Sequence, residues 1–416
     1  MKIRRLELGS FRCYASARFE PDGGITVLYG RNAQGKTNLM EAIVLCSIGR
    51  SHRTNRDREM IAWDQPRARV SLEAAHRDGT HDVKITLTRD DARVKQVCIG
   101  ASPVARIGDL MGHVPSVLFS PEDLKLIKEG PGERRRFMDM AISQVRPAYF
   151  AALQQYTRVL RQRNELLRAL KFESIGGAAA AGRLDPWNEL LCDYGSRIIE
   201  NRAWFLNRLA PAARDAHNYL SETNENLEIE YEAAAAAGGD IEEIKADLGR
   251  KIYAARKRDE YNMGTGVGPH RDDFSLSLNG RQARVYGSQG QQRTAALALK
   301  LAALAILEEE MNETPVLLLD DVMSELDAGR RRRLLTWMGG VQTIITCADI
   351  NDIGGGVLAG KMYRVNSMGS FEWGYKDKID KGIDASKCVA CGACEAACPQ
   401  NIAIIDNLAM IRDKYN

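Results

Sequence analysis

Gly30-Arg-Asn-Ala-Gln-Gly-Lys-Thr37 decides the fold of this 416-residue chain, because of what lies on either side of it. The apolar run Ile25–Tyr29 before it has the composition of a buried strand, and Asn38–Leu45 after it has helical spacing. Two glycines let the loop curl so that successive backbone N–H groups point to one place, and the N-terminus of the helix adds a partial positive charge. The stretch therefore predicts a loop that binds the phosphates of a nucleotide.

Each residue of this loop has an expected part in binding a nucleoside triphosphate. Lys36 can reach the terminal phosphates as a point charge, and the Thr37 hydroxyl is an expected ligand of Mg²⁺. The alternative is a glycine-rich turn that precedes a helix by chance, and the strand, the helix and the Lys-Thr pair argue against it. The other candidate nucleotide-binding residues of the segment are Gly30, Arg31, Asn32, Ala33, Gln34, Gly35 and Asn38.

A second segment, Val316-Leu-Leu-Leu-Asp320-Asp321, has the pattern of a central parallel strand that ends in two carboxylates. We expect Asp320 to hold the Mg²⁺ shell and Asp321 to position or deprotonate the attacking water, so that Lys36, Asp320 and Asp321 are the candidate catalytic residues. The alternative is a buried strand that ends by chance in two solvated aspartates. Almost the whole chain separates the two segments, which predicts a large insertion into one nucleotide-binding domain.

The composition is that of an ordinary globular protein, with 44% hydrophobic and 27% charged residues. A net charge of +3 means that any binding to nucleic acid must come from local patches. No apolar region follows the charges at the start of the chain, and no apolar stretch is long enough to cross a bilayer. We therefore expect a cytoplasmic protein of two or three domains without a membrane partner.

The texture of the sequence changes along the chain and predicts four regions. Residues 1–124 and 263–373 combine strands and helices, as expected for the two parts of an α/β ATPase lobe, whereas 125–262 is mainly helical. The fold class is therefore an α/β nucleotide-binding head with an inserted α-helical lobe, followed by a separate segment at 374–416. Within the lobe we expect helices over 133–171 with a break at Pro147, 186–220 and 241–262, a strand at 227–231, and linkers at 175–182 and 233–239.

Ser288-Gln289-Gly290 precedes a strongly helical run, Thr294–Glu310, one helix upstream of the Asp320 strand. The segment resembles the signature of ATP-binding-cassette proteins, which contacts the nucleotide held by the other subunit; the alternative is an N-capped helix after a loop. Downstream, Ser324–Asp327 resembles the D-loop that crosses the dimer interface in that class. The usual switch histidine would fall near Cys347 and is missing, so Thr346 is the better candidate for a sensor of the γ-phosphate.

Seven separated blocks in order resemble the RecF family, within the cassette-type ATPases of chromosome maintenance. The resemblance covers about residues 1–373 and implies an ATPase that forms an ATP-dependent homodimer, with each ATP between Lys36 of one subunit and Ser288 of the other. It also implies binding to duplex DNA near single-strand gaps, slow ATP turnover, and help from recombination mediator proteins in loading the recombinase. The blocks are 8–14, 30–38, 47–54, 119–124, 130–139, 268–274 and the Ser288 segment.

Clustered arginines are the candidates for DNA contacts. Between Pro131 and Lys171 there are nine Lys and Arg against three Asp and Glu, and phosphate contacts are made mainly by such side chains. The alternative is a solvated helix face. No base-reading motif is visible, so we expect recognition of DNA shape or junctions. The candidates are Arg134, Arg135, Arg136, Arg158, Arg161 and Arg163, with a second cluster of Arg50, Arg53, Arg56 and Arg58 near the ATP site.

The last segment has the spacing C-x₂-C-x₂-C-x₃-C-P, formed by Cys388, Cys391, Cys394 and Cys398. This spacing is that of a bacterial ferredoxin and predicts a 4Fe–4S cluster on a small ferredoxin-like α+β fragment. In two-cluster ferredoxins the fourth cysteine serves the other cluster, and no second group follows here. Alternatives are a zinc site or a fusion remnant without a redox role. The alternative functions are a redox-linked ATPase or electron carrier and, against the RecF-like blocks, a transporter motor.

Overall fold

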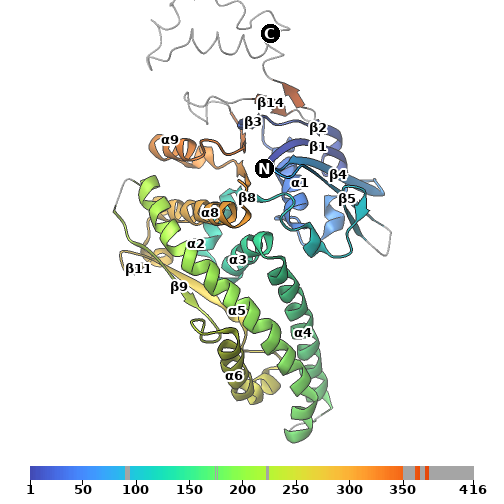
Figure 1. Cartoon of the computed structure of the whole chain (residues 1–416), viewed down its shortest axis with the longest axis vertical. Coiled ribbons are helices and arrows are strands. Elements are labelled where there is room, and N and C mark those ends of the chain that lie inside the picture. The colour runs from blue at the N-terminus through green and yellow to red at the C-terminus, as the bar shows by residue number, and fades with distance from the viewer. Residues whose placement is uncertain are drawn as a thin grey trace, which may run out of the picture.

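The computed structural model describes residues 1–89, 94–173, 175, 177–221, 224–349, 361–365 and 371–373. The molecule is elongated: two sheets form a head at one end, and α4, α5 and α6 extend away from it as a helical lobe (Figure 1). The α/β head with an inserted helical lobe is therefore confirmed. The four cysteines of the C-terminal motif lie outside the described residues. No helix of the described part is long and apolar enough to cross a membrane.

The first sheet of the head is antiparallel and has the strand order β2-β1-β4-β5-β6-β7. Side chains alternate between its two faces, so that the neighbours Leu8, Val70 and Ile85 all point to one buried face. The opposite face is polar. The strands are β1 (Lys2–Phe11), β2 (Tyr14–Phe19), β4 (Arg67–Ala75), β5 (Thr80–Thr88), β6 (Lys95–Ile99) and β7 (Ser102–Pro103).

The second sheet has the order β15-β14-β3-β13-β12-β8 and is parallel except for β15. All five residues of β12 are buried, as its apolar sequence predicts. Helix α1 (Lys36–Ile48) lies between the two sheets, and its Leu39 shares one core with Val70 of the first sheet and Leu318 of the second. The strands are β3 (Ile25–Tyr29), β8 (Ser116–Phe119), β12 (Val316–Asp320), β13 (Thr343–Cys347), β14 (Lys361–Val365) and β15 (Phe371–Trp373).

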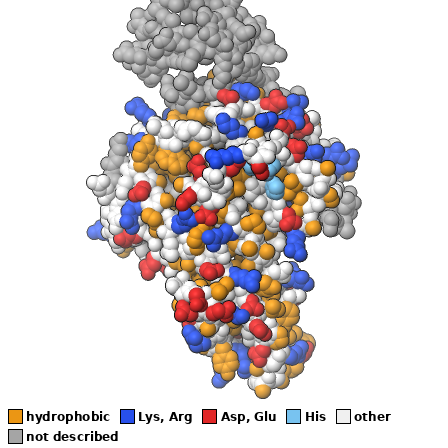
Figure 2. All heavy atoms as spheres, viewed as in Figure 1, with side chains coloured by type: hydrophobic (Ala, Val, Ile, Leu, Met, Phe, Trp, Pro, Cys, Tyr) orange, Lys and Arg blue, Asp and Glu red, His pale blue; other side chains and the backbone are white. Residues whose placement is uncertain are grey.

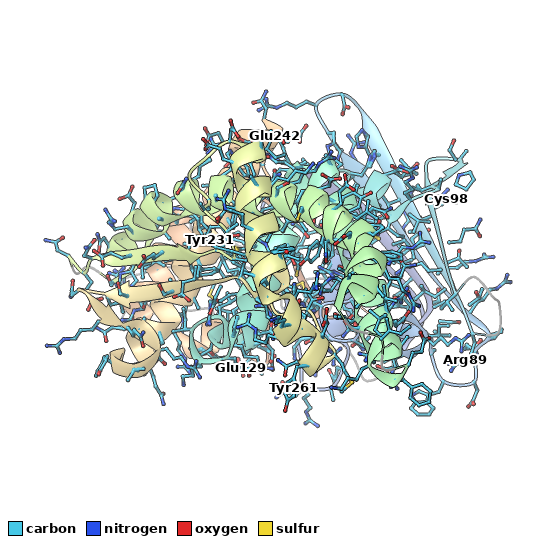
Figure 3. All side chains as sticks on the ribbon, turned by 90° about the horizontal axis from the view of Figure 1, so that it is seen from below. Arg89, Cys98, Glu129, Tyr231, Glu242 and Tyr261 are labelled. Atoms are coloured by element: carbon cyan, nitrogen blue, oxygen red, sulfur yellow. The ribbon has the colours of Figure 1, made fainter. Side chains whose placement is uncertain are left out.

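The lobe is built on one long helix, α5 (Gly177–Ser221), which packs against α4 (Pro147–Phe172) and α6 (Ile241–Asn262). Figure 3 views the molecule from the end of the lobe. Glu242 and Tyr261 lie near the two ends of α6, and Arg89 and Cys98 belong to the side of the molecule formed by the first sheet. The other helices are α2 (Lys125–Lys128), α3 (Pro131–Val145), α7 (Ala283–Tyr286), α8 (Gln289–Met311) and α9 (Ala328–Trp337). A small sheet joins β9 (Leu227–Glu232), β10 (Asp273–Leu278) and β11 (Arg281–Gln282), and 3-10 turns are η1 (Asp57–Met60), η2 (Ile107–Leu110), η3 (Pro121–Leu124), η4 (Pro269–Arg271) and η5 (Met323–Glu325).

Most lobe elements agree with the sequence, and one does not. The break before Pro147, the strand at β9 and the helix at 241–262 are confirmed. The predicted linker at 175–182 was wrong, because α5 already begins at Gly177 and runs through Pro186. Ala180 and Leu184 are fully buried against Leu167 and Leu170 of α4, so packing outweighs the low helix propensity of the glycines.

Arg163 is part of the lobe core, which corrects its assignment as a phosphate contact. Its Nη1 lies 2.9 Å from Oδ2 of Asp259 and donates to the Thr265 hydroxyl at 2.7 Å, and both members of the ion pair are buried. A charge in this position can be stable only with its partner, because desolvation of an unpaired ion costs several kcal/mol.

Replacing Arg163 with methionine should therefore lower the free energy of unfolding by about 3–5 kcal/mol, because it leaves the Asp259 carboxylate buried without a partner. Arg158→Met on the same helix is the matched control: Arg158 is exposed, and its loss should cost less than about 0.5 kcal/mol. Urea denaturation of both variants measures the difference. Equal midpoints for the two variants would contradict the structural role of Arg163.

Candidate nucleotide site

The phosphate loop joins β3 to α1 and requires glycine at both of its marked positions. Gly30 and Gly35 have φ values of +148° and +106°, which side chains rarely adopt. A Cβ at Gly35 would also lie 2.6 Å from the sulfur of Cys13 and 2.9 Å from the hydroxyl oxygen of Tyr14. That hydroxyl donates to the carbonyl of Gly35 at 2.9 Å. The turn between β1 and β2 and the first residue of β2 therefore pack against the loop at Gly35.

Lys36 lies over the loop. It is the first residue of α1, and its side chain folds back over the loop, where Nζ donates to the carbonyls of Gly30 at 2.5 Å and Arg31 at 3.2 Å. The residue is only 4% exposed. A buried ammonium group at the N-terminus of a helix, beside a glycine-rich loop, is an arrangement suited to a polyanion.

Thr37 and Asp320 come together although they lie 283 residues apart in sequence. The Thr37 hydroxyl donates to Oδ1 of Asp320 at 3.1 Å, because β3 and β12 flank β13 and end at the same edge of the sheet. Mg²⁺ prefers oxygen ligands and takes one or two from the protein, with the rest from phosphates and water. The hydroxyl and the carboxylate fit this requirement.

Thr346 at the end of β13 links the two aspartates. Its hydroxyl donates to Oδ1 of Asp320 at 2.7 Å and accepts the backbone N–H of Asp321 at 3.0 Å. Asp321 itself has a φ of +53° and is half-buried, whereas Asp320 is buried. The sequence identified Thr346 as a candidate sensor, and this bridging contact was not foreseen. The sensor role itself stays a prediction.

The burial of Asp320 has a consequence for pH dependence. Desolvation raises the pKa of its carboxyl above the ordinary value, although bonds from the Thr346 and Thr37 hydroxyls favour the ionised form. Mg²⁺ binds only the ionised carboxylate, so protons should displace Mg²⁺ at a higher pH than they would at an exposed aspartate. Mg²⁺-dependent nucleotide binding should thus be weaker at about pH 5 than at about pH 7.5, after correction for protonation of the free nucleotide.

A Mg²⁺ titration at both pH values measures this difference in affinity. Asp320→Asn should remove the pH-dependent component. An affinity of the wild-type chain that is the same at both pH values would contradict the prediction.

A cavity of about 600 Å³ opens beside these residues, and Thr37, Asp320 and Asp321 are among those that line it. Four cationic side chains line the same cavity together with His52: Arg53, Lys125, Arg136 and Lys300. Lys300 is held by Asp123 and the carbonyl of Leu118, both at 2.8 Å. No residue of the Ser288 segment is among those lining this cavity in the described part of the chain.

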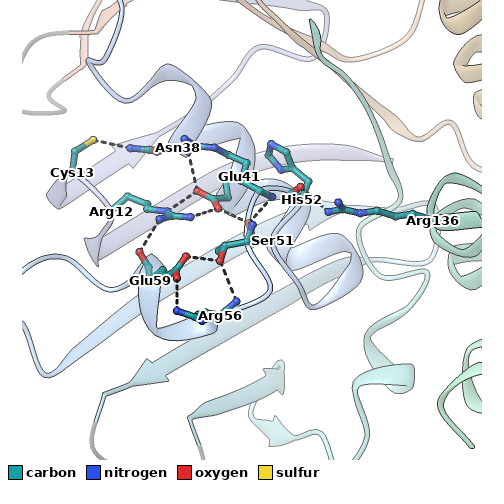
Figure 4. A network of polar contacts seen from close by, with 11 residues as sticks. Arg12, Cys13, Asn38, Glu41, Ser51, His52, Arg56, Glu59 and Arg136 are labelled. Atoms are coloured by element: carbon teal, nitrogen blue, oxygen red, sulfur yellow. Dashed lines mark hydrogen bonds and ion pairs between the residues drawn. The ribbon is translucent and has the colours of Figure 1, made fainter. Parts of the chain in front are cut away.

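A polar network on α1 was missed by the sequence reading (Figure 4). Glu41 is buried in the middle of it and accepts from Arg12 at 2.6 and 2.8 Å and from the Ser51 hydroxyl at 2.5 Å. Arg53 donates to the side chain of Asn38 at 2.8 Å. Arg12 and Ser51 both occur in blocks of family resemblance, which was the available signal. A second cavity of about 800 Å³ adjoins this network at Arg12. Arg58 and the 91% exposed Trp63 are among its other lining residues.

Ser288 caps helix α8. Its hydroxyl oxygen accepts the N–H of Gln291 at 3.2 Å, and the Gln291 side chain accepts the N–H of Ser288 at 2.8 Å. The helix therefore starts at Gln289, five residues earlier than predicted. Ser288 and Gln289 are exposed and Gly290 is half-buried, so the N-terminus of α8 is accessible at the surface.

The candidate DNA contacts divide into buried or half-buried side chains and exposed ones. Arg134 is buried and bonded to both oxygens of Asp273 at 2.6 and 2.8 Å, so it holds α3 on β10 and is withdrawn as a phosphate contact. Arg135 and Arg136 are half-buried and each donates to a backbone carbonyl. On the face shown in Figure 2, Lys and Arg alternate with Asp and Glu. The exposed candidates are Arg50, Arg53, Arg56, Arg58, Arg158 and Arg161.

Comparisons with known proteins agree with this geometry. The family model "RecF/RecN/SMC N terminal domain" matches residues 2–353, and "4Fe-4S binding domain" matches 382–403. The "DNA replication and repair protein RecF" of Acetivibrio thermocellus is 41% identical over 84% of this chain and 94% of its own length, and that of Halothermothrix orenii is 42% identical over 84% and 92%. A solved structure described as the "recombination mediator protein RecF-ATP in RecFOR pathway" is 36% identical and covers 89% of this chain and 97% of its own, with a TM-score of 0.82. The Smc head domain of Pyrococcus furiosus, at 15% identity over 92% of this chain and 98% of its own and a TM-score of 0.52, shares the fold.

Proposed function

Because the chain belongs to the RecF family, we propose that it is an ATP-dependent DNA-binding protein of recombinational repair and replication-gap repair. The observation that supports this proposal is the contact between Thr37 and Asp320, which brings the phosphate loop and the acidic strand together as a candidate site for Mg²⁺ and ATP. In this proposal ATP joins two copies of the chain around duplex DNA near a single-strand gap, and slow hydrolysis releases them.

Each step of the proposed nucleotide cycle has a candidate residue in the site. The loop 30–35 and Lys36 would hold the phosphates, Thr37 and Asp320 would hold Mg²⁺, and Asp321 would orient the attacking water. Mg²⁺, when bound, offsets the charge that develops on the transferred phosphoryl group.

The hydrogen bonds of Ser288 leave its hydroxyl able to donate to a nucleotide held by a second subunit. Its oxygen already accepts a hydrogen bond from Gln291, so its own hydroxyl hydrogen remains able to donate to a phosphate. It is exposed and does not line the cavity over Asp320 of its own chain. This supports a nucleotide held between Lys36 of one copy and Ser288 of the other.

For the DNA, we propose phosphate contacts from the exposed arginines, with Arg158 and Arg161 on α4 and Arg50 and Arg53 near the ATP site. Such contacts position a duplex and read no bases, so recognition of a gap must rest on DNA shape. Recombination mediator proteins and the recombinase are the partners that fit this role, in the cytoplasm and without a membrane component.

Gel-shift binding tests the proposal with three DNAs of equal length: gapped duplex, intact duplex and single strand. We expect ATP to tighten binding to the gapped duplex more than to the others. Equal affinity for all three, with and without ATP, would leave only nonspecific electrostatic binding and contradict the proposed function.

A second candidate function rests on the match to a 4Fe–4S binding domain at 382–403. We propose that Cys388, Cys391, Cys394 and Cys398 hold such a cluster, which would make the chain a redox-linked ATPase. Anaerobic purification with iron analysis tests this, and Cys391→Ser is the matched variant. A colourless, iron-free protein would exclude the cluster, and ATP turnover that is the same with oxidised and reduced cluster would exclude the redox link.

A further inference from the structure

Arg330 lies directly against the Ser288 segment. A Cβ placed on Gly290 would be 3.3 Å from Nη1 and 3.6 Å from Nη2 of Arg330, so the guanidinium rests on the α-carbon of that glycine. Arg330 comes from the first turn of α9, just after the segment Ser324–Asp327. Two stretches that are separate in sequence thus place a cation beside the exposed start of α8.

Asp327 fixes the position of this cation. It caps α9 by accepting the N–H of Arg330 at 2.8 Å, and its other oxygen accepts from Nη1 at 3.0 Å. Within the described part of the chain, no bond is formed by Nε or Nη2, and the side chain is 27% exposed. Arg330 is therefore held at one nitrogen and can still donate two parallel hydrogen bonds to an anion.

Glu225, the acidic residue beside Gln291, already has partners for both of its carboxylate oxygens. Oε1 of Glu225 accepts from the Gln291 side chain at 2.6 Å, and its Oε2 lies 3.7 Å from the buried His217. Glu225 thereby braces the Gln291 side chain that caps α8 with Ser288. The N-terminus of α8, the Ser288 hydroxyl and the free edge of Arg330 are left as three groups that favour negative charge at one exposed place.

We propose that Arg330 is the residue by which one subunit binds the terminal phosphate of the ATP held in its partner. This inference rests on the proposed ATP-dependent dimer. The Ser288 hydroxyl and the helix supply only partial charges, and a guanidinium adds the full charge and the paired donors that a γ-phosphate requires. Arg330 would then stabilise both the dimer and the charge that develops during hydrolysis.

Variants of Arg330 test its action across the interface. Arg330→Ala should leave ATP binding by the single subunit unchanged and weaken ATP-dependent dimerisation about 10- to 100-fold, the range expected for loss of a charge-assisted hydrogen bond. Arg332→Ala is the matched control, because Arg332 is exposed on the same helix and its side chain has no bond in the described part of the chain. It should dimerise like the wild type.

Mixing two inactive variants decides between action within a subunit and action across the interface. A mixed dimer of Lys36→Ala and Arg330→Ala subunits contains one complete site, made by Lys36 of the second and Arg330 of the first. Hydrolysis should therefore reappear in the mixture at up to about half of the wild-type rate per mixed dimer, since one of two sites is restored. No recovery, or loss of single-subunit ATP binding in Arg330→Ala, would overturn the inference. A wild-type chain that does not dimerise with ATP would instead contradict the proposed function.

Discussion

Replacing Lys36 with alanine should abolish ATP binding and, with it, every ATP-dependent property of the protein. Lys36 is a buried cation that folds back over the phosphate loop, with Nζ on the carbonyls of Gly30 and Arg31. Without it the backbone N–H groups of the loop have to bind the terminal phosphates without the ammonium charge. We expect the affinity for ATP to fall at least about 100-fold, the loss of a charged contact of about 3 kcal/mol.

Calorimetric titration with Mg²⁺·ATP measures this loss, and Arg31→Ala is its control. Arg31 belongs to the same loop but is exposed, so its removal should change the affinity far less. Circular dichroism should show a folded Lys36→Ala chain, because the side chain's two bonds go to loop carbonyls and not to the core. Normal ATP binding by a folded Lys36→Ala variant would contradict the assignment of the loop.

Asp321→Asn should separate ATP binding from ATP hydrolysis. A general base contributes about 10²- to 10⁴-fold to a rate, so turnover should fall by that amount while ATP still binds. The substitution fits the backbone, since asparagine accepts the left-handed φ of +53° at this position as readily as aspartate. The ATP-bound dimer should consequently outlast that of the wild type.

Asp320→Asn is the informative comparison, because Asp320 contacts Thr37 and is assigned to Mg²⁺. It should lose Mg²⁺-dependent binding, whereas Asp321→Asn should retain it. Single-turnover hydrolysis and nucleotide-binding measurements on both variants resolve the two roles. Equal hydrolysis by Asp321→Asn and the wild type would remove Asp321 from the chemistry.

The site was predictable where the signal is local. A strand, two glycines and a helix within one short stretch predict the phosphate loop. A continuous apolar run predicts β12. The break before Pro147 follows from the missing N–H of proline. These features are set by neighbours in sequence, so their order along the chain also indicated that distant segments form one head.

The remaining features depend on tertiary packing and could not be read in this way. Arg134 and Arg163 are basic residues on amphipathic helices, and only the fold brings Asp273 and Asp259 to them. The helical start of α5 at Gly177 depends on burial against α4. The bridge from Thr346 to both aspartates requires β12 and β13 to be neighbours, which their sequences do not specify.

The claim that two copies of the chain share each ATP is tested most directly by the molar mass in solution. Light scattering after size-exclusion chromatography should give about 46.2 kDa without nucleotide and, for the slowly hydrolysing Asp321→Asn chain with Mg²⁺·ATP, about twice that mass. Lys36→Ala under the same conditions should remain at the monomer mass. A monomer mass for the ATP-bound Asp321→Asn chain, at saturating ATP, would contradict the shared site.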